Sequence, residues 1–546
     1  MRVKYLFCCT GEVDTYKQEV MELLKMAWPM ALTQFLMFLP LFVSQSFCGH
    51  LGKESMDGAA LASTIINVTG VFVIIGLSTA ADALFSQTYG SGNTEEVGVI
   101  LQKGIWILML SCLPCWALFL NTGLILQSFG MDNDVSSIGG QFATLSIPNL
   151  PGHGLDILLR KFLQAQSIVI PSLLVGIIIN MVNAGLHALF IDVIGLETRG
   201  AALALTLTYW CSVLFHVLFI ICRGYYKTTW KGWSRESLYG WGTFMKLAIP
   251  GLFMMCLEFW SFEIITLMGG FLGKADLAAN TIIYNVALLM YVIVFGMSGA
   301  GGIRVGLYLG TGDTKMAQVA SRVALGCGLC FAVLIAVLLA SLNNYIPHIF
   351  SNDKDVLALA SPMMLQLAIF KVTDTIQATG GGLLRGIGLH AFGAIFNFVG
   401  YYIIALPISI PLMFATYLRI AGAYWGMIIG SFLNCVIYCV RIFTLDWEEE
   451  TRKALKRAGV EEADRNTDKI IKSSDEKQPI RMADINLNDG SKCYNSVDGS
   501  IQTSAQANKM DNLPSYHQRI LCKIITLISF LLILVGGVCI RIFVRV

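Results

Sequence analysis

The sequence predicts an all-α integral membrane protein that consists of two six-helix lobes and a thirteenth membrane helix near the carboxyl end. Three observations support this fold class. Apolar residues make up 55% of the 546 residues and charged residues only 14%, and the mean hydropathy is +0.66. Soluble proteins carry about 25% charged residues. Long apolar segments recur along the chain, and a set of short motifs occurs twice.

The apolar segments are long enough to cross a membrane as helices. A hydrocarbon core of about 30 Å requires roughly 20 apolar residues. On this rule the sequence predicts twelve spans, near residues 26–47, 58–88, 100–121, 138–159, 168–192, 199–221, 245–272, 277–303, 318–342, 356–383, 391–416 and 421–445. A thirteenth span is predicted near residues 522–541.

The positions of Lys and Arg predict how these spans are oriented, because cytoplasmic connections carry an excess of both residues. The connection between the sixth and seventh spans, for example, carries Arg223, Lys227, Lys231 and Arg235. We therefore expect the amino terminus in the cytoplasm and, after thirteen spans, the carboxyl terminus outside the cell. The first 22 residues are mixed polar and do not resemble a cleavable signal, so the first helix is expected to direct insertion.

An internal repeat divides the first twelve spans into two halves. Four motifs recur at a displacement of 220 or 221 residues: Leu24–Pro29 with Met245–Pro250, His50–Lys53 with Phe271–Lys274, Gly76–Ser78 with Gly296–Ser298, and Gly90–Asn93 with Gly310–Asp313. Six spans in each half mean that both halves enter the membrane from the same side. This is the parallel-repeat arrangement of transporters, in which a substrate cavity lies between two halves that rock against each other.

The repeat and the changes in composition predict six segments. Residues 447–518 are rich in charged residues and in Ser and Asn, and such a composition buries too little apolar surface to offset chain entropy. The segments are 1–22 (cytoplasmic amino-terminal segment), 23–222 (first lobe), 223–244 (cytoplasmic linker), 245–446 (second lobe), 447–518 (disordered cytoplasmic tail) and 519–546 (final span, expected to be an anchor, and extracellular end).

The deepest ionisable residues lie in the second lobe. Glu258 and Glu263 are near the middle of the apolar stretch 247–272, and Asp374 is inside a later span. An ionised carboxylate at this depth costs at least about 2.5 kcal/mol, so it tends to face water or a partner. Desolvation favours the protonated form. A carboxyl group that exchanges a proton can attract an organic cation when it is ionised and release it when protonated, which suffices for antiport.

Alternatives for the acids remain open. A hydroxyl or backbone partner could neutralise them structurally, and for Asp374 the adjoining Thr373 and Thr375 could do so. Glu258 and Glu263 are five residues apart, about 140° around a helix, so they do not share one narrow face. Asp82 and Asp156 lie near the predicted cytoplasmic ends of their spans, where water can relieve them.

Polar and aromatic residues are expected to complete the cavity. In the first lobe Gln34 and Asn67 are the chief neutral polar residues at comparable depth. Aromatic faces suit ammonium ligands through cation–π contacts. The aromatic candidates are Phe259, Phe262, Tyr284 and Tyr291, the last two being seven apart on one helical face; aromatic helix packing is the alternative for each. His187 and His216 are interpreted as packing residues rather than proton relays.

Several classes of function are not supported. A formal charge of +2 argues against nucleic acid as a partner. The sequence contains neither a metal-ligand cluster nor a nucleophile triad, so we expect no metal site, no catalytic residues, no enzyme activity and no cofactor apart from the coupling proton. The fifteen cysteines are scattered through apolar segments and are interpreted as small buried hydrophobic residues.

Several stretches resemble the animal multidrug and toxin extrusion (MATE) family. They are Cys48-Gly-His-Leu-Gly-Lys53, Ile66-Asn-Val-Thr-Gly70, Ser86-Gln-Thr-Tyr-Gly-Ser91, Cys115-Trp-Ala-Leu-Phe-Leu-Asn-Thr122, Gly382-Leu-Leu-Arg-Gly386 and Pro411-Leu-Met-Phe-Ala-Thr416. The resemblance covers residues 20–445 and the extra terminal helix. It implies a monomeric transporter in the plasma membrane that exchanges protons for small organic cations, such as tetraethylammonium-like compounds.

The resemblance also implies roles for individual residues, and the sequence departs from the family at some of them. The seventh-helix acid pair matches Glu258 and Glu263. The acid that follows a tyrosine in the eighth helix is Asn285 here, beside Tyr284, and the tenth-helix glutamate is Asp374. Phe259 and Phe262 stand where the family has Trp and Tyr. These departures predict a narrower or shifted range of substrates.

Two other functions are weighed against cation export. A lipid-linked glycan flippase of the related superfamily would favour a wide basic cavity that binds pyrophosphate. The sequence predicts no deep cluster of Lys or Arg. A receptor or scaffold that acts through its tail would tolerate Glu258→Gln and Glu263→Gln, whereas an antiporter would lose uptake driven by a pH gradient.

Overall fold

The structure is a computed structural model that describes residues 12–351 and 353–460. All regular secondary structure in these residues is helical. The elements of the first half are α1 (Glu12–His50), α2 (Lys53–Ile66), η1 (Asn67–Val71), α3 (Phe72–Ser78), α4 (Ala80–Gly90), α5 (Thr94–Leu120), α6 (Thr122–Ser128), α7 (Asn133–Leu145), α8 (Asn149–Ala165), α9 (Ile170–His187), η2 (Ala188–Val193) and α10 (Glu197–Arg223). η1 and η2 are π-helical turns within long helices.

The second half repeats this order after the short helix η3 (Arg235–Leu238). Its elements are α11 (Gly242–Gly269), α12 (Lys274–Thr311), α13 (Thr314–Ser341), α14 (Tyr345–Phe350), α15 (Lys354–Ile387), α16 (His390–Asn397), the π-helical η4 (Phe398–Ala405), α17 (Leu406–Phe414) and α18 (Ile420–Phe443). The short helices α6 and α14 occupy equivalent places in the two halves, as do the long helices α5 and α13. The order of the elements therefore follows the repeat in the sequence.

Eleven helical stretches among the described residues are long and apolar enough to cross a membrane, and each overlaps a predicted span. The fourth predicted span, 138–159, differs because it is divided between α7 and α8. The division falls at Ser146–Pro148, where the Ser146 hydroxyl donates to the Phe142 carbonyl at 2.8 Å. Pro148 lacks the N–H that a continuous helix requires. The thirteenth predicted span lies outside the described residues.

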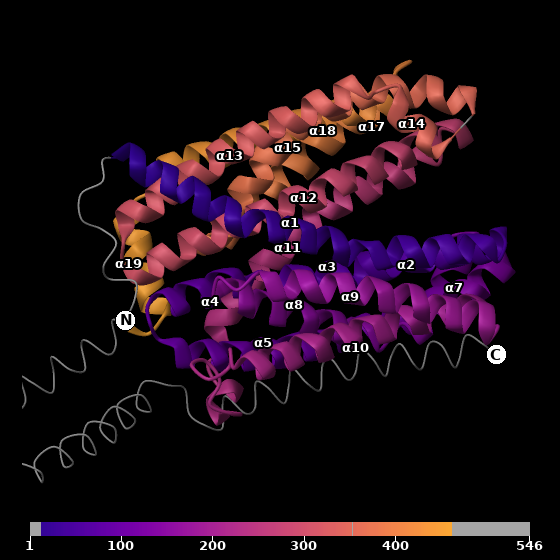
Figure 1. The fold of residues 1–546 in the computed structure, drawn as a ribbon. Coiled ribbons are helices and arrows are strands. Elements are labelled where there is room, and N and C mark those ends of the chain that lie inside the picture. The colour runs from indigo at the N-terminus through magenta and orange to yellow at the C-terminus, as the bar shows by residue number, and fades with distance from the viewer. Residues whose placement is uncertain (1–11, 352, 461–546) are drawn as a thin grey trace, which may run out of the picture.

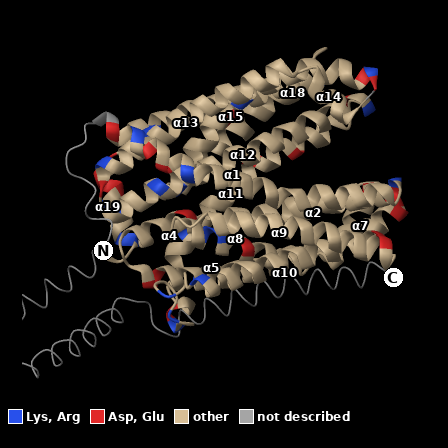
Figure 2. Cartoon of the chain, viewed as in Figure 1, with Lys and Arg blue, Asp and Glu red and all other residues tan. Residues whose placement is uncertain are grey.

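The two halves form two bundles that lie together at one end of the molecule and diverge toward the other (Figure 1). α1 and α11 lie between the bundles, and α4 and α19 (Trp447–Arg457) mark the end where they meet (Figure 1). Charged residues gather at both ends, and few lie along the middle of the helices (Figure 2). This distribution is typical of helices whose middle parts lie in a bilayer.

Glycines of the repeated motifs lie at close approaches between the two halves. A Cβ built on Gly76 would lie 2.6 Å from the Leu252 Cα, and one on Gly296 would collide with the backbone of Ala31. Gly90 lies equally close to the carbonyl of Leu307. The repeat is thus visible as pairs of equivalent contacts: α3 against α11, and α12 against α1.

The predicted disordered tail 447–518 is wrong at its beginning, because residues Trp447–Arg457 form the helix α19. The Asp446 carboxylate caps this helix and accepts from the Glu449 N–H at 3.1 Å. Lys453 lies 2.8 Å from Glu449 and thereby adds an ion pair on the helix surface. Trp447 is buried. The residues from 461 onward lie outside the described structure.

Candidate functional site

Glu258 lies near the middle of α11, with its carboxylate buried inside the second half at a fractional exposure of 7%. The Asn397 Nδ2 atom lies 3.5 Å from Glu258 Oε2 and donates to the Met254 carbonyl at 2.8 Å. The Tyr438 hydroxyl donates to Asn397 Oδ1 at 2.7 Å and fixes the orientation of this amide. Tyr291 on α12 is another polar neighbour of Glu258. The partners of Glu258 are thus polar and uncharged.

Asp374 pairs with a lysine on its own helix. Lys371 Nζ lies 2.7 Å from Asp374 Oδ2, and both side chains are only 2% exposed. The ammonium also lies 5.6 Å from the ring centroid of Tyr291 and 5.5 Å from that of Phe370. The neighbouring Thr373 donates to the Phe370 carbonyl instead of satisfying Asp374. The ion pair with Lys371 was not predicted from the sequence.

Glu263 belongs to a second polar group, one and a half turns further along α11. It is partly exposed, and its Oε1 accepts from the Tyr284 hydroxyl at 3.1 Å. One turn before Tyr284 on α12, the Asn280 side chain donates to the Thr266 hydroxyl of α11 at 3.1 Å and accepts from the Tyr424 hydroxyl. The structure therefore places Glu258 with Asp374 and Tyr291, and Glu263 with Tyr284, as the angle between the two glutamates predicts.

The aromatic candidates beside the glutamates make contacts both across and within the halves. Phe259 stacks on Phe72 of the first half, with ring centroids 4.3 Å apart, and packs edge-on against Tyr291 at 5.6 Å. Phe262 packs against Phe370 and Tyr401 within the second half. Phe259 is thus the candidate that lies at the junction of the halves, whereas Phe262 contributes to the core of the second half.

The neutral polar candidates do not lie together. Gln34 Oε1 accepts from the Arg160 guanidinium at 2.8 Å and so belongs to a polar group of the first half. Asn67 begins the π-helical turn η1, and the next residue, Val68, accepts from the Trp260 indole at 3.2 Å. Asn285 lines a hollow of about 450 Å³ together with residues of α12, α14 and α15. These three residues are partly exposed.

A buried charged group in the first half was missed from the sequence. Asp156 was expected to be relieved by water, but its side chain is fully buried. It accepts from Arg160 at 3.0 Å and from the Ser212 hydroxyl at 2.6 Å, and it lies 3.2 Å from His216 Nδ1. His216 is therefore part of a polar network, whereas the ring of His187 hydrogen-bonds the Asn183 carbonyl on its own helix.

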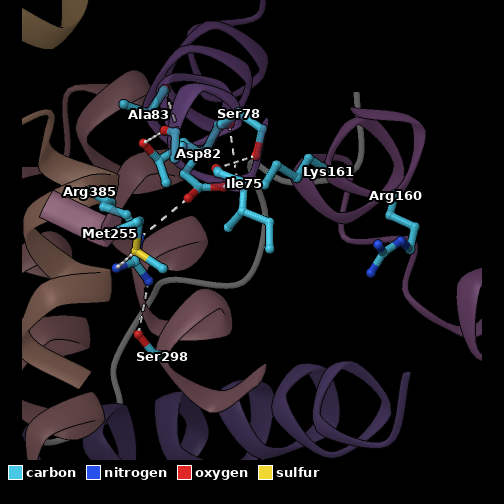
Figure 3. Close-up of polar contacts among 12 residues, drawn as sticks. Ile75, Ser78, Asp82, Ala83, Arg160, Lys161, Met255, Ser298 and Arg385 are labelled. Atoms are coloured by element: carbon cyan, nitrogen blue, oxygen red, sulfur yellow. Dashed lines mark hydrogen bonds and ion pairs between the residues drawn. The ribbon is translucent and has the colours of Figure 1, made fainter. Parts of the chain in front are cut away.

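A third polar group joins the two halves (Figure 3). Asp82 of α4 lies 2.7 Å from Lys161 of the same half and 3.5 Å from Arg385 of the other half. Arg385 also donates to the Ser298 hydroxyl at 3.2 Å, and Lys161 donates to the Ser78 carbonyl at 3.0 Å. Ser78 and Ser298 belong to one pair of repeated motifs. The ion pairs of Asp82 with Lys161 and Arg385 thus link these two equivalent serines, one from each half.

The sequence predicts no deep cluster of Lys or Arg, but the structure does bury basic side chains singly. Arg160, Lys371 and Arg385 are all buried. Each is paired with a carboxylate from another turn of its own helix or from another helix. Among the described residues, no group of three or more His, Cys, Asp or Glu could hold a metal ion.

Comparisons with known proteins identify relatives along almost the whole chain. The MatE family model matches residues 29–189 and 250–410, two segments at the displacement of the internal repeat. Multidrug and toxin extrusion protein 1 of Homo sapiens is 37% identical over 549 residues, covering 98% of this chain and 95% of that protein. The protein of the same name from Xenopus tropicalis is 42% identical over 441 residues, covering 81% and 77% respectively.

A solved structure is also similar. The eukaryotic MATE transporter AtDTX14 superposes on the chain with a TM-score of 0.79 and 28% sequence identity. The superposition covers 82% of this chain and 100% of that one.

Proposed function

Since the chain belongs to the multidrug and toxin extrusion (MATE) family of membrane transporters, we propose that it exports small organic cations in exchange for protons. Glu258 and Glu263 of the second lobe take part in the exchange, and alternating access between the two lobes moves the substrate across the plasma membrane. The names of the relatives, multidrug and toxin extrusion proteins 1 and 2, support extrusion of drugs and toxins as the class of activity. The coupling ion and the charge of the substrate are our inference.

The observation that carries the proposal is the environment of Glu258. Its carboxylate is buried and has no Lys or Arg within ion-pair distance among the described residues. Its polar neighbours, Asn397 and Tyr291, are uncharged. A carboxylate without a fixed counter-charge is free to bind either a proton or a cation, whereas a paired carboxylate already has its partner.

The surroundings of Glu258 also suit an organic cation. Phe259 and Tyr291 lie next to it, and their ring faces attract ammonium groups through cation–π interactions. Phe259 stacks on Phe72 of the other lobe, so relative movement of the lobes alters this aromatic wall. Movement of the lobes would thereby change the affinity for the cation. Antiport requires that the affinity for the cation differs between the state open to one side of the membrane and the state open to the other.

The direct test is uptake of labelled tetraethylammonium into cells or vesicles, with and without an imposed proton gradient. We expect uptake to increase when the gradient drives protons outward, against the entering cation. Glu258→Gln keeps the shape of the side chain and removes its charge, so it should abolish the response to the gradient. Glu54→Gln, which changes an exposed acid of α2, is the matched control and should leave uptake unchanged. Gradient-independent uptake in the unmodified protein would contradict proton coupling.

Export of a lipid-linked pyrophosphate glycan remains the second candidate, because buried basic residues do exist in this chain. Arg160, Lys371 and Arg385 are each within ion-pair distance of a carboxylate. A basic side chain whose charge is matched offers little attraction to pyrophosphate, so the geometry favours a cation. Flipping of a fluorescent lipid pyrophosphate by reconstituted protein, without uptake of tetraethylammonium, would reverse this choice. A scaffold role predicts neither activity.

A further inference from the structure

The ammonium of Lys371 occupies a site with the chemistry that recognises an organic cation. It lies 2.7 Å from a carboxylate oxygen of Asp374. The ring centroids of Tyr291 and Phe370 lie 5.6 and 5.5 Å from its nitrogen. A carboxylate combined with aromatic faces is the usual environment of ammonium ligands in proteins. The second lobe thus holds a cation of its own beside Glu258.

Of the two carboxylates at this site, only Asp374 has a basic partner within ion-pair distance in the part of the chain that the structure describes. Three charged groups act electrostatically on Glu258, namely Asp374, Lys371 and Arg385. Lys371 is paired with Asp374, and Arg385 is within ion-pair distance of Asp82 in the first lobe. Among the described residues Glu258 has no such partner. One carboxylate therefore remains available, and a second is neutralised by a tethered ammonium.

We propose that Lys371 is a resident counter-cation that withdraws Asp374 from the exchange and leaves Glu258 as the carboxylate at which proton and substrate compete. The site then accepts one positive charge, and its substrates are monovalent organic cations. This inference rests on the proposed function and defines the substrate class more narrowly. Lys371 is a specificity-determining residue because it sets the number of negative charges that a substrate meets.

Dications provide the sharpest test of this role. Removal of the lysine in Lys371→Met keeps an unbranched side chain of similar length and frees the Asp374 carboxylate. A bis-quaternary dication such as hexamethonium would then meet two carboxylates instead of one. We expect its affinity relative to tetraethylammonium to rise at least tenfold. The measurement is inhibition of labelled tetraethylammonium uptake by each compound, at equal surface expression.

Two further variants separate charge from shape. Lys371→Arg retains the positive charge and should leave the ratio of the two affinities near that of the unmodified protein. The double variant Lys371→Met with Asp374→Asn removes both charges, so the ratio should return to the unmodified value although the lysine is absent. If Lys371 had only a structural role, Lys371→Met and the double variant would give the same ratio of the two affinities.

Lys371→Met leaves the buried Asp374 carboxylate unpaired, so this variant could fail to fold. In that case Asp374→Asn is compared with the double variant. Asp374→Asn leaves the ammonium unmatched beside Glu258 and should lower the affinity for tetraethylammonium, and the second substitution should restore it. An unchanged ratio in a correctly inserted Lys371→Met, or a double variant no better than Asp374→Asn, overturns the proposal. Absence of gradient-driven uptake in the unmodified protein instead overturns the proposed function.

Discussion

The backbone of Gly76 on α3 lies directly against Leu252 on α11, so that a Cβ at Gly76 would be 2.6 Å from the Leu252 Cα. The equivalent glycine of the second half, Gly296, has the same relation to Ala31 on α1. Ala31 and Leu252 are themselves separated by the 221 positions of the internal repeat. The two lobes thus meet through a pair of pseudo-symmetric contacts in which the backbones touch.

Substitution of Gly76 should therefore separate the lobes locally. In Gly76→Ala the added methyl group collides with main-chain atoms, which do not move aside as a flexible side chain would. We expect a loss of about 1–3 kcal/mol of stability, the usual cost of overpacking. The measurement is the thermal unfolding midpoint of the purified protein in detergent.

Gly185→Ala is the matched control, because a Cβ at this exposed position of α9 meets no atom within 4 Å. Alanine is the better helix former, so this variant should be neutral or more stable by up to about 1 kcal/mol. Equal midpoints for the two variants would show that the contact at Gly76 tolerates a side chain.

The sequence predicted the two halves because a repeat is visible in residue identities alone. It also predicted the separation of Glu258 from Glu263, since helical geometry fixes the angle between residues five apart. It gave no physical reason for the repeated glycines. That reason is the close approach of Gly76 and Gly296 to the opposite half, and it depends on packing between segments that are far apart in the sequence.

The ion pairs were harder to predict. Lys371 and Asp374 are three residues apart, so helical spacing alone could have identified this pair. The partners of Asp156, in contrast, include Ser212 and His216 on another helix, and Arg385 reaches Asp82 across the two halves. No local pattern predicts which helices become neighbours. The helix α19 had a local signal, the cap residue Asp446 before Glu449 and Lys453, but the polar composition of the tail concealed it.

Asn285 should limit the range of substrates. It is partly exposed in a hollow of about 450 Å³, near Tyr284, which binds Glu263. Asn285→Glu adds a carboxylate to the lining of this hollow, so we expect uptake of a wider set of organic cations. The measurement is initial uptake of several labelled cations at equal surface expression. Asn285→Gln, with the same length and no charge, serves as the control, and an unchanged range in Asn285→Glu would contradict the role.

The buried network around Asp156 should be a source of stability. Asp156→Asn keeps the size of the side chain but leaves the Arg160 charge without its carboxylate. Breaking a buried ion pair in this way costs about 3–5 kcal/mol. We therefore expect a clearly lower unfolding midpoint in detergent. Asp134→Asn, at an exposed position of α7, should leave the midpoint unchanged, and similar midpoints for both variants would show that the network contributes little.

The helix α19 should hold the lobes together at the end where they meet. Arg457 donates to the Gln87 side chain and to the Ile387 carbonyl, both at 2.8 Å, and Gln87 itself donates to the Gly386 carbonyl. One guanidinium thus connects α4 of the first lobe with the end of α15 in the second. Burial lowers the pKa of Arg457 and the Glu450 carboxylate opposes this shift, so the contact depends on a charge that is partly removed from water.

Arg457→Ala removes these bonds and leaves the side-chain oxygen of Gln87 unpaired, at a cost of about 1–3 kcal/mol. The Ile387 carbonyl keeps the Gln87 amide as a donor at 3.0 Å. The lobes should then separate more often at this end. A cysteine introduced at Thr88, which is buried on α4, would react faster with a membrane-impermeant maleimide applied to that face. Arg452→Ala changes an exposed arginine of the same helix and should not alter the rate. If both variants react at the rate of the parent, α19 does not restrain the lobes, and the opening must be limited by contacts such as Asp82 with Arg385.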